Sequence, residues 1–334
     1  MLEILMHFSQ QFNKEEPICS IERIGINMIY SFTITNYLGD TIKLTLREPA
    51  LSGFLIKSVT GLGPVKANIN TTEVATNDGS KFNSARLTQR NIVFQMVFVD
   101  TLKGESIEDI RQKSYKYFPT KKNVDIIIET DNRYVKTTGY VESNEPNIFS
   151  SQEGAQISII CPDPYFYTAG NDGDIVTEFY SVAPMLEFPF SNESLTDSMI
   201  IVSEIQNRTA GVITYYGDIE IGIVIRIHVL GEATNIAIYN TDTRETMKID
   251  TNKIKNITGK GLVASDDIII NTTKGNKSIT LLREGVSYNI LNCLGKNPDW
   301  FTLTKGDNIF AFTAETGITN LQFIVENKIV YEGV

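Results

Sequence analysis

The sequence has few of the residues that carry catalysis or bind metals: in 334 residues there are two histidines, one tryptophan and three cysteines. The cysteines are scattered, with no Cys-x-x-Cys pair and no histidine partner, so we interpret them as reduced structural thiols. No Gly-x-Ser-x-Gly, His-Glu-x-x-His or Walker A sequence occurs. We therefore predict a protein that is not an enzyme and uses no metal or cofactor.

Positive charge and long apolar runs are also scarce. The chain carries 30 Lys+Arg against 40 Asp+Glu, a formal charge of −10, which argues against a nucleic-acid-binding surface. No apolar run approaches the roughly 20 residues that a membrane-spanning helix needs. The first residues lack the basic segment of a secretory signal peptide. We expect no sequence-specific nucleic-acid binding, no membrane span, and synthesis in the cytoplasm.

Length and composition predict two domains. A chain of 334 residues with 42% hydrophobic residues is long enough for two separate cores. Two prolines and a run of small, polar residues near residue 170 predict the boundary. We divide the chain into an N-terminal extension (1–27), a first domain (28–170), a linker (171–183) and a second domain (184–334). The extension is either a partner-docking arm or a surface element packed on its own domain.

The first domain is expected to be a β-sandwich with one helix. Residues 106–118 have helical apolar spacing, begin with a capping-box-like Ser106 and Asp109, and stop before Pro119. Alternating or continuous apolar patterns predict strands elsewhere. The expected strands lie in a hairpin at 28–46 and at 54–59, 91–99, 124–129, 134–142 and 155–161.

The second domain shows essentially no helical pattern. Turn residues recur about every 8–12 residues, which is typical of an antiparallel β-sandwich. The expected strands lie at 212–216, 221–230, 235–240, 245–249, 267–271, 278–283, 301–303, 308–313 and 321–326. The fold class is therefore mainly β throughout.

Residues 61–98 fit neither a core nor a simple loop. Glycines and a proline stand at 61–64, and Asp78-Gly79 favours the tight turn of a hairpin. The arms on either side of this turn hold too few apolar side chains to form their own core, and a two-stranded ribbon is marginal in water. The ribbon is either a floppy surface hairpin or is ordered by a neighbouring chain. The candidate inter-subunit residues are Val65, Ile69, Asp78, Gly79, Phe82, Arg86 and Arg90.

Other candidate sites are weaker. His228 lies on the exposed side of an alternating strand, and Asp266 and Asp267 fall on opposite faces of another, which disfavours acid–base catalysis. The run 171–174 slightly resembles a calcium loop, but it lacks the later ligands, so we interpret it as a linker turn. Trp300 is the one candidate glycan contact.

The order of these features resembles the distal tail proteins of long-tailed bacteriophages and related phage-tail-like particles. In the first half the resemblance rests on GLGPVKANI (61–69), ARLTQRNIVF (85–94), VDIIIE (124–129), GYVES (139–143) and ISIICPDPYFY (157–167). In the second half it rests on NRTAG (207–211), IIINTTKG (268–275), WFTL (300–303) and YEGV (331–334). No single motif is diagnostic, but their order along residues 28–334 is fairly specific.

The resemblance implies a structural role at the virion tail tip, in a particle assembled in the host bacterial cytoplasm. Such proteins form a hexameric ring that joins the tail tube to the host-recognition apparatus. The first domain would be the tail-tube-like ring former, with its hairpin on a neighbouring copy, and the second a galectin-like sandwich facing outward. The implied partners are the chain itself, tail-tube subunits, the tail-tip hub, and receptor-binding or baseplate proteins. The alternative is a carbohydrate-binding module that attaches the particle to host glycans.

Overall fold

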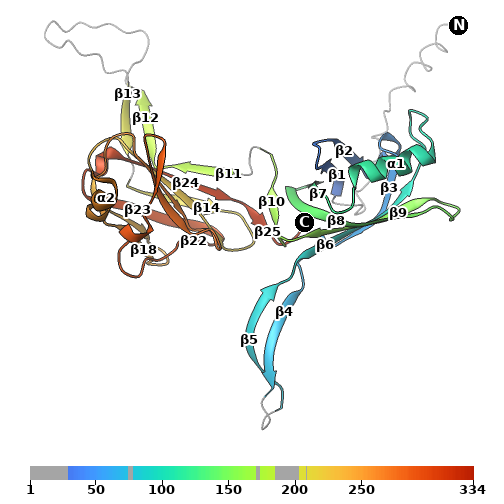
Figure 1. Cartoon of the computed structure of the whole chain (residues 1–334), viewed down its shortest axis with the longest axis horizontal. Helices are drawn as coiled ribbons and strands as arrows, with labels where there is room; N and C mark the ends of the chain where they lie inside the picture. Colours follow the sequence, from blue (N-terminus) through green and yellow to red (C-terminus); the bar gives the residue numbers. More distant parts are fainter. Residues whose placement is uncertain (1–28, 74–77, 171–173, 185–202, 208) are drawn as a thin grey trace, which may run out of the picture.

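A computed structural model describes residues 29–73, 78–170, 174–184, 203–207 and 209–334. It has two β-rich lobes with one long hairpin projecting away from them (Figure 1). The predicted N-terminal extension, Cys19 and most of the run 171–174 lie outside the described residues. The mainly β prediction is confirmed, with antiparallel sheets in both lobes.

The first lobe is one antiparallel sheet with strand order β2-β1-β7-β8-β9-β6-β3. The sheet folds back over itself, since Phe32 of β1 and Phe94 of β6 meet edge-to-face with ring centroids 5.2 Å apart although three strands separate them. These alternating strands therefore enclose a core between two layers. The strands are β1 (Ile29–Asn36), β2 (Thr41–Thr45), β3 (Phe54–Thr60), β6 (Arg90–Phe98), β7 (Asn123–Thr130), β8 (Tyr134–Asn147) and β9 (Gly154–Cys161).

Helix α1 (Ile107–Tyr117) covers this core. It starts with the predicted capping box: Asp109 N donates to Ser106 Oγ, and Ser106 N donates to the Asp109 carboxylate at 3.0 Å. The buried residues Ile110 and Ser114 face the sheet, and Phe118 packs against Phe94. The amphipathic pattern thus places the helix where the sequence predicts it.

The second lobe is a sandwich of two main sheets. One has the order β11-β24-β16-β19-β20-β21 and the other β14-β23-β17-β18. Phe312 of one sheet stacks on Phe323 of the other, with centroids 4.1 Å apart. The strands are β11 (Asp174–Glu178), β14 (Ala210–Tyr215), β16 (Val224–Val229), β17 (Thr234–Asn240), β18 (Thr246–Ile249), β19 (Asp267–Asn271), β20 (Ser278–Arg283), β21 (Val286–Asn289), β23 (Gly306–Thr316) and β24 (Leu321–Lys328). Two short pairs join β12 (Tyr180–Pro184) to β13 (Ser203–Asn207) and β15 (Ile221–Gly222) to β22 (Thr302–Leu303).

One helix in this lobe contradicts the prediction of an all-strand domain. Helix α2 (Thr251–Thr258) begins at Asp250, whose carboxylate accepts from the backbone N–H groups of residues 252 and 253. It ends at Gly259, which has a φ of 78° and so ends the helix in the left-handed region that favours glycine. The helix buries Ile254, so this short amphipathic helix packs its apolar side on the core of the second lobe.

The domain limits stay a prediction, and the structure shows how the segments between the two lobes pair. From Asp174 the expected linker is strand β11, which pairs with β24 of the second lobe. The segment after β24 returns to the first lobe, where β25 (Val330–Tyr331) pairs with β10 (Phe166–Thr168). Backbone hydrogen bonding, which local sequence patterns do not reveal, therefore connects the two lobes through their ends.

Candidate assembly surface

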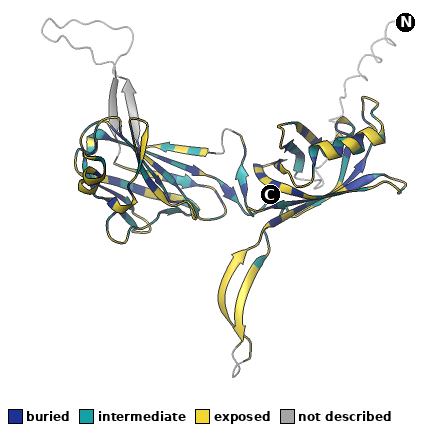
Figure 2. Ribbon diagram, in the orientation of Figure 1, coloured by how far each residue is buried: buried dark blue, intermediate teal, exposed yellow. Residues whose placement is uncertain are grey.

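The ribbon predicted at residues 65–90 is the hairpin of β4 (Ala67–Glu73) and β5 (Ser80–Leu87). Among the described residues these strands pair only with each other. All of β5 and all of β4 beyond Ala67 are exposed, and the hairpin is almost wholly yellow in Figure 2. It therefore has no core of its own in a single copy of the chain.

The hairpin has two chemically different faces. A β-bulge between Asn70 and Thr71 places Phe82 opposite Thr71, and therefore on the same face as Ile69. Ile69 and Phe82 are each 60% exposed. The apolar face comprises Ala67, Ile69, Phe82, Ala85 and Leu87, and Thr71, Glu73 and Ser80 continue the same face towards the turn. The opposite, polar face comprises Asn68, Asn70, Thr72, Lys81, Ser84 and Arg86.

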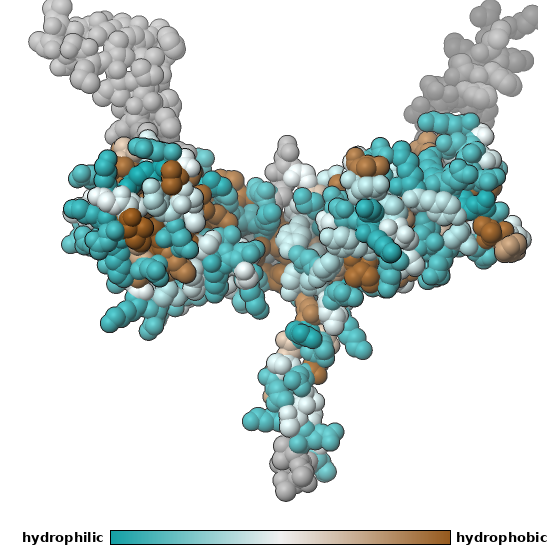
Figure 3. Space-filling model, viewed as in Figure 1, coloured by the Kyte–Doolittle hydropathy of each residue, from teal (hydrophilic) through white to brown (hydrophobic). Residues whose placement is uncertain are grey.

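These hydrophobic side chains stand out on a surface that is otherwise mostly polar. Figure 3 shows a largely hydrophilic face of the molecule, with hydrophobic residues interrupting the hairpin. An extended apolar strip without a covering element marks an interaction site. The apolar face of the hairpin is therefore a candidate surface for a partner.

The turn and the root of the hairpin use glycine for backbone reasons. Gly79 has a φ of 91° beside Asp78, as the predicted turn requires. Gly61 has a φ of 86°, and a Cβ there would meet the Asn91 backbone oxygen at 1.9 Å. The hairpin thus leaves the sheet through a turn that admits no side chain at residue 61.

Arg90 lies apart from the other predicted contact residues. We predicted it on the inter-subunit hairpin, but it opens β6 and is 1% exposed. Its guanidinium donates to four backbone carbonyl oxygens: Pro164 at 2.8 Å, Gly61 at 2.5 Å, Gly63 at 2.7 Å and Glu332 at 2.6 Å. The arginine is buried because it satisfies these carbonyls at the root, so in this structure it cannot face a neighbouring copy.

A second arginine, Arg133, contacts the segment that includes Tyr331 and Gly333. Arg133 forms an ion pair with Asp218 of the second lobe at 3.1 Å and donates to the backbone oxygen of Gly333. Its guanidinium lies 4.3 Å from the centre of the Tyr331 ring. Both arginines therefore fix the last described residues against the first lobe.

The remaining predicted hairpin residues divide between root and ribbon. Val65 precedes β4 and is half-buried, where it lines a small cavity with Leu87, Pro164 and Glu332. Arg86 is exposed on the polar face. The structure thus brings Ile69 and Phe82 together on one face and separates them from Arg86.

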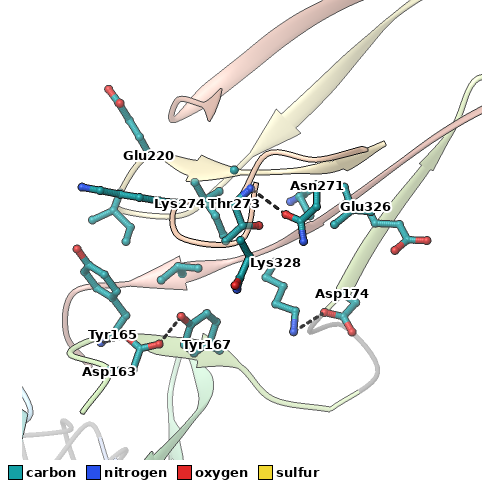
Figure 4. A pocket seen from close by; sticks show the side chains of 17 residues that line it. Asp163, Tyr165, Tyr167, Asp174, Glu220, Asn271, Thr273, Lys274, Glu326 and Lys328 are labelled. Carbon is teal, nitrogen blue, oxygen red and sulfur yellow. Dashed lines mark hydrogen bonds and ion pairs between the residues drawn. The ribbon is translucent and has the colours of Figure 1, made fainter. Parts of the chain in front are cut away.

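A groove of about 900 Å³ lies between the lobes (Figure 4). Tyr167 donates to Asp163 at 2.6 Å on one wall, and burial raises the pKa of the Tyr167 hydroxyl above its ordinary value, reinforced by that carboxylate. Lys328 pairs with Asp174 on another wall. Tyr165 and Lys274 also line the groove, and their side-chain polar atoms have no partner among the described residues.

Trp300 is half-buried and packs against the core of the second lobe. The Lys277 Nζ lies 5.2 Å from its ring centre. The Trp300 indole is therefore covered partly by the core of the second lobe and partly by the Lys277 side chain.

Among the other titratable groups, sequence reasoning missed one buried pair. Arg283 donates to the Asp266 carboxylate through two nitrogens, at 2.7 and 2.5 Å, and Asp266 is 1% exposed. His228 lies 2.6 Å from Asp267 on the partly exposed face of β16. In the described part of the chain no three His, Cys, Asp or Glu side chains are grouped to hold a metal ion. No helix there is long and apolar enough to span a membrane.

Comparison with known proteins gives a structural match without a sequence match. No family model matches the sequence, and no curated protein does. The fold is similar to the crystal structure of the Dit protein of phage SPP1, described as a paradigm of the hub adsorption apparatus in phages that infect Gram-positive bacteria. The TM-score is 0.54 and the identity 14%, over 90% of this chain and 98% of that one. A chain in the activated baseplate of phage p2 matches with a TM-score of 0.39 and 13% identity, over 89% and 98% of the two chains. The resemblance inferred from the order of sequence features is therefore confirmed for the fold: this chain has the two-lobed β fold of the SPP1 Dit protein.

Proposed function

We propose that this chain is a structural component of a phage tail tip or baseplate. In this role copies of the chain form a ring, a hexamer, that connects the tail tube to the host-recognition apparatus. The observation that carries the proposal is the hairpin β4–β5, whose apolar face of Ile69, Phe82 and Leu87 is exposed in the single chain.

The physical argument is the cost of leaving this face in water. Burying a large apolar side chain stabilises a complex by about 1.5–3 kcal/mol. Within the described part of the chain no element covers Ile69 or Phe82, and a neighbouring molecule can supply this burial. A second copy supplies such a surface identically at every position of a closed ring.

The fold supports the wider assignment. The SPP1 Dit protein is named as a hub of an adsorption apparatus, and its fold extends over nearly the whole of this chain. On this basis the first lobe contacts tail-tube subunits and the tail-tip hub. The second lobe carries receptor-binding or baseplate proteins on its outer side. The role of the chain in the particle is structural rather than enzymatic.

The test is the oligomeric state of the full chain. Native mass spectrometry and light scattering are expected to show a ring of the unaltered chain, formed alone or on addition of tube or hub partners. Deleting residues 71–84 removes the outer hairpin and is expected to weaken the ring while the melting temperature of the two lobes stays unchanged. A strict monomer at every concentration and with every partner would overturn the proposal.

A second candidate function is carbohydrate binding, and the groove that both lobes line favours it. Its volume of about 900 Å³ lies in the range of small-molecule sites, and it offers Tyr165 and Lys274 without internal partners. A glycan array probed with the full chain tests this function. Saturable binding lost in Lys274→Ala would place the sugar in the groove, and binding lost in Trp300→Ala would place it at the predicted tryptophan. Silence across the array removes the candidate.

A further inference from the structure

The segment 330–334 connects the core of the second lobe directly to the root of the hairpin. Strand β24 pairs with both β11 and β16, so it is firmly part of the second lobe. Only Ile329 separates it from β25, which pairs with β10 of the first lobe. The chain therefore passes from one lobe to the other as nearly continuous hydrogen-bonded strand.

After β25 every residue of the segment bonds either to the hairpin root, residues 61–63, or to one of the two arginines, Arg90 and Arg133. The Glu332 backbone oxygen accepts from Arg90 Nη2 at 2.6 Å, and the Gly333 oxygen accepts from Arg133. Val334 N donates to the Leu62 oxygen at 3.1 Å. Leu62 and Val334 also pack against the same hydrophobic core. The segment is thus bonded to residue 62, inside the turn from which the hairpin leaves the sheet.

Arg90 ties this segment to both sides of that turn. The same guanidinium that holds Glu332 also donates to the oxygens of Gly61 and Gly63. Its four hydrogen-bond acceptors are all backbone carbonyls, so the bonds fix the course of the chain rather than another side chain. A planar guanidinium presents its donors in a rigid fork, whereas a lysine amine offers three donors around one atom.

We propose that the segment 330–334, held by Arg90 and Arg133, fixes the direction of the hairpin relative to the second lobe, with Arg90 as the positioning residue. The first lobe, the hairpin and the second lobe then move as one unit. Displacing the second lobe shifts the turn at residues 61–63 and, through it, the hairpin. The use of this coupling in ring assembly rests on the proposed function, whereas the coupling itself is a property of the single chain.

Pulsed electron–electron double resonance, which measures the distance between two spin labels, tests the coupling on the full chain. Spin labels are placed on exposed lysines, at Lys81→Cys in β5 and Lys255→Cys in α2, in a background with Cys19→Ser. Arg90→Lys is expected to broaden and shift the distance distribution between the labels. Arg86→Lys, on the exposed polar face of β5, is the matched control and is expected to leave the distribution unchanged.

A second variant keeps the test decisive if Arg90→Lys does not fold. A chain ending at Tyr331 retains Arg90 but lacks the bonds from residues 332–334, and it is expected to broaden the distribution in the same way. A distribution as narrow as that of the parent in a folded Arg90→Lys or shortened chain would overturn the coupling. Oligomer measurements on the same samples separate the two proposals. Broadening of the distance distribution with an unaffected ring refutes the role of hairpin direction in assembly, and a monomer in all samples, with and without tube or hub partners, refutes the ring.

Discussion

The guanidinium carbon of Arg90 lies 4.1 Å from the centre of the Phe166 ring. This cation–π contact places a charged group beneath the hairpin root, where burial lowers the pKa of the guanidinium and the nearby Cys161 and Asp163 oppose that shift in part. An arginine remains protonated in proteins, so the charge is permanent. The backbone dipoles of four carbonyls and one aromatic face compensate it.

Removing this group is expected to destabilise the first lobe. Arg90→Met leaves buried carbonyl oxygens without donors, and we expect a loss of about 3 kcal/mol or more in the free energy of unfolding. Arg86→Met, at an exposed position, should stay within about 0.5 kcal/mol of the parent. Urea unfolding of both variants measures the difference. Equal midpoints would show that the carbonyls find other partners.

The two glycines of the hairpin root provide a matched pair. Gly61→Ala adds a Cβ that would meet the Asn91 oxygen at 1.9 Å, at a φ of 86°, so the backbone must move. Gly63→Ala has nothing within 4 Å of the added atom. We expect a clear fall in the melting temperature for residue 61 and little change for residue 63. The reverse order in differential scanning calorimetry would contradict the described turn.

The two faces of the hairpin are expected to differ in assembly. Phe82→Asp places a charge on the apolar face and should weaken the ring by at least about tenfold in dissociation constant, since about 1.4 kcal/mol of lost burial suffices. Ser84→Asp adds the same charge on the polar face and should have a smaller effect. Analytical ultracentrifugation compares the two, and thermal unfolding confirms that both monomers are folded. Equal weakening would show that charge, rather than the apolar face, governs association.

The Arg283–Asp266 ion pair inside the second lobe is expected to make the single variant less stable than the double variant. Arg283→Met leaves the buried Asp266 carboxylate with the backbone N–H of Val263 as its one donor among the described residues. Breaking a buried pair in this way costs about 3–5 kcal/mol. The double variant Arg283→Met, Asp266→Leu should recover much of the loss, because no unpaired charge remains. Chemical denaturation of the single and double variants tests this, and no recovery would contradict it.

High pH is expected to weaken the second lobe through a tyrosine. Burial raises the pKa of Tyr215 to about 12, with the Val330 backbone opposing the shift. Because the folded state favours the protonated hydroxyl, its contribution is complete below the ordinary value of 10.0 and is lost as the pH rises through about 12. Tyr215→Phe should therefore flatten the decline in stability above pH 10, by up to roughly 1.4 kcal/mol per pH unit. Parallel declines in parent and variant would contradict this role.

The sequence allowed prediction of those elements whose signals are local. Helix α1 follows from Ser106, Asp109 and an apolar stripe, and the strands follow from alternation. Helix α2 has equally local caps in Asp250 and Gly259, but eight residues give too short a stripe to stand out between strands. Its packing on β17, rather than its propensity, makes it a helix.

The candidate site was less predictable because its partners are distant in sequence. The acceptors of Arg90 come from residues 61, 63, 164 and 332, and no spacing brings these together. The apolar face of the hairpin depends on the bulge at Asn70–Thr71. In a regular ladder Phe82 would lie opposite Thr72 and point away from Ile69. A single extra residue, Asn83, therefore creates the strip.

The outer strands of the large sheet bear on how copies can associate. Among the described residues β2 and β3 end this sheet, and each carries a lysine, Lys43 in the middle of β2 and Lys57 in a bulge of β3. Charged and bulged edges resist the unlimited strand-by-strand growth that produces fibrils. On the proposed function, free subunits are therefore expected to stay in solution without growing into filaments through these two edges.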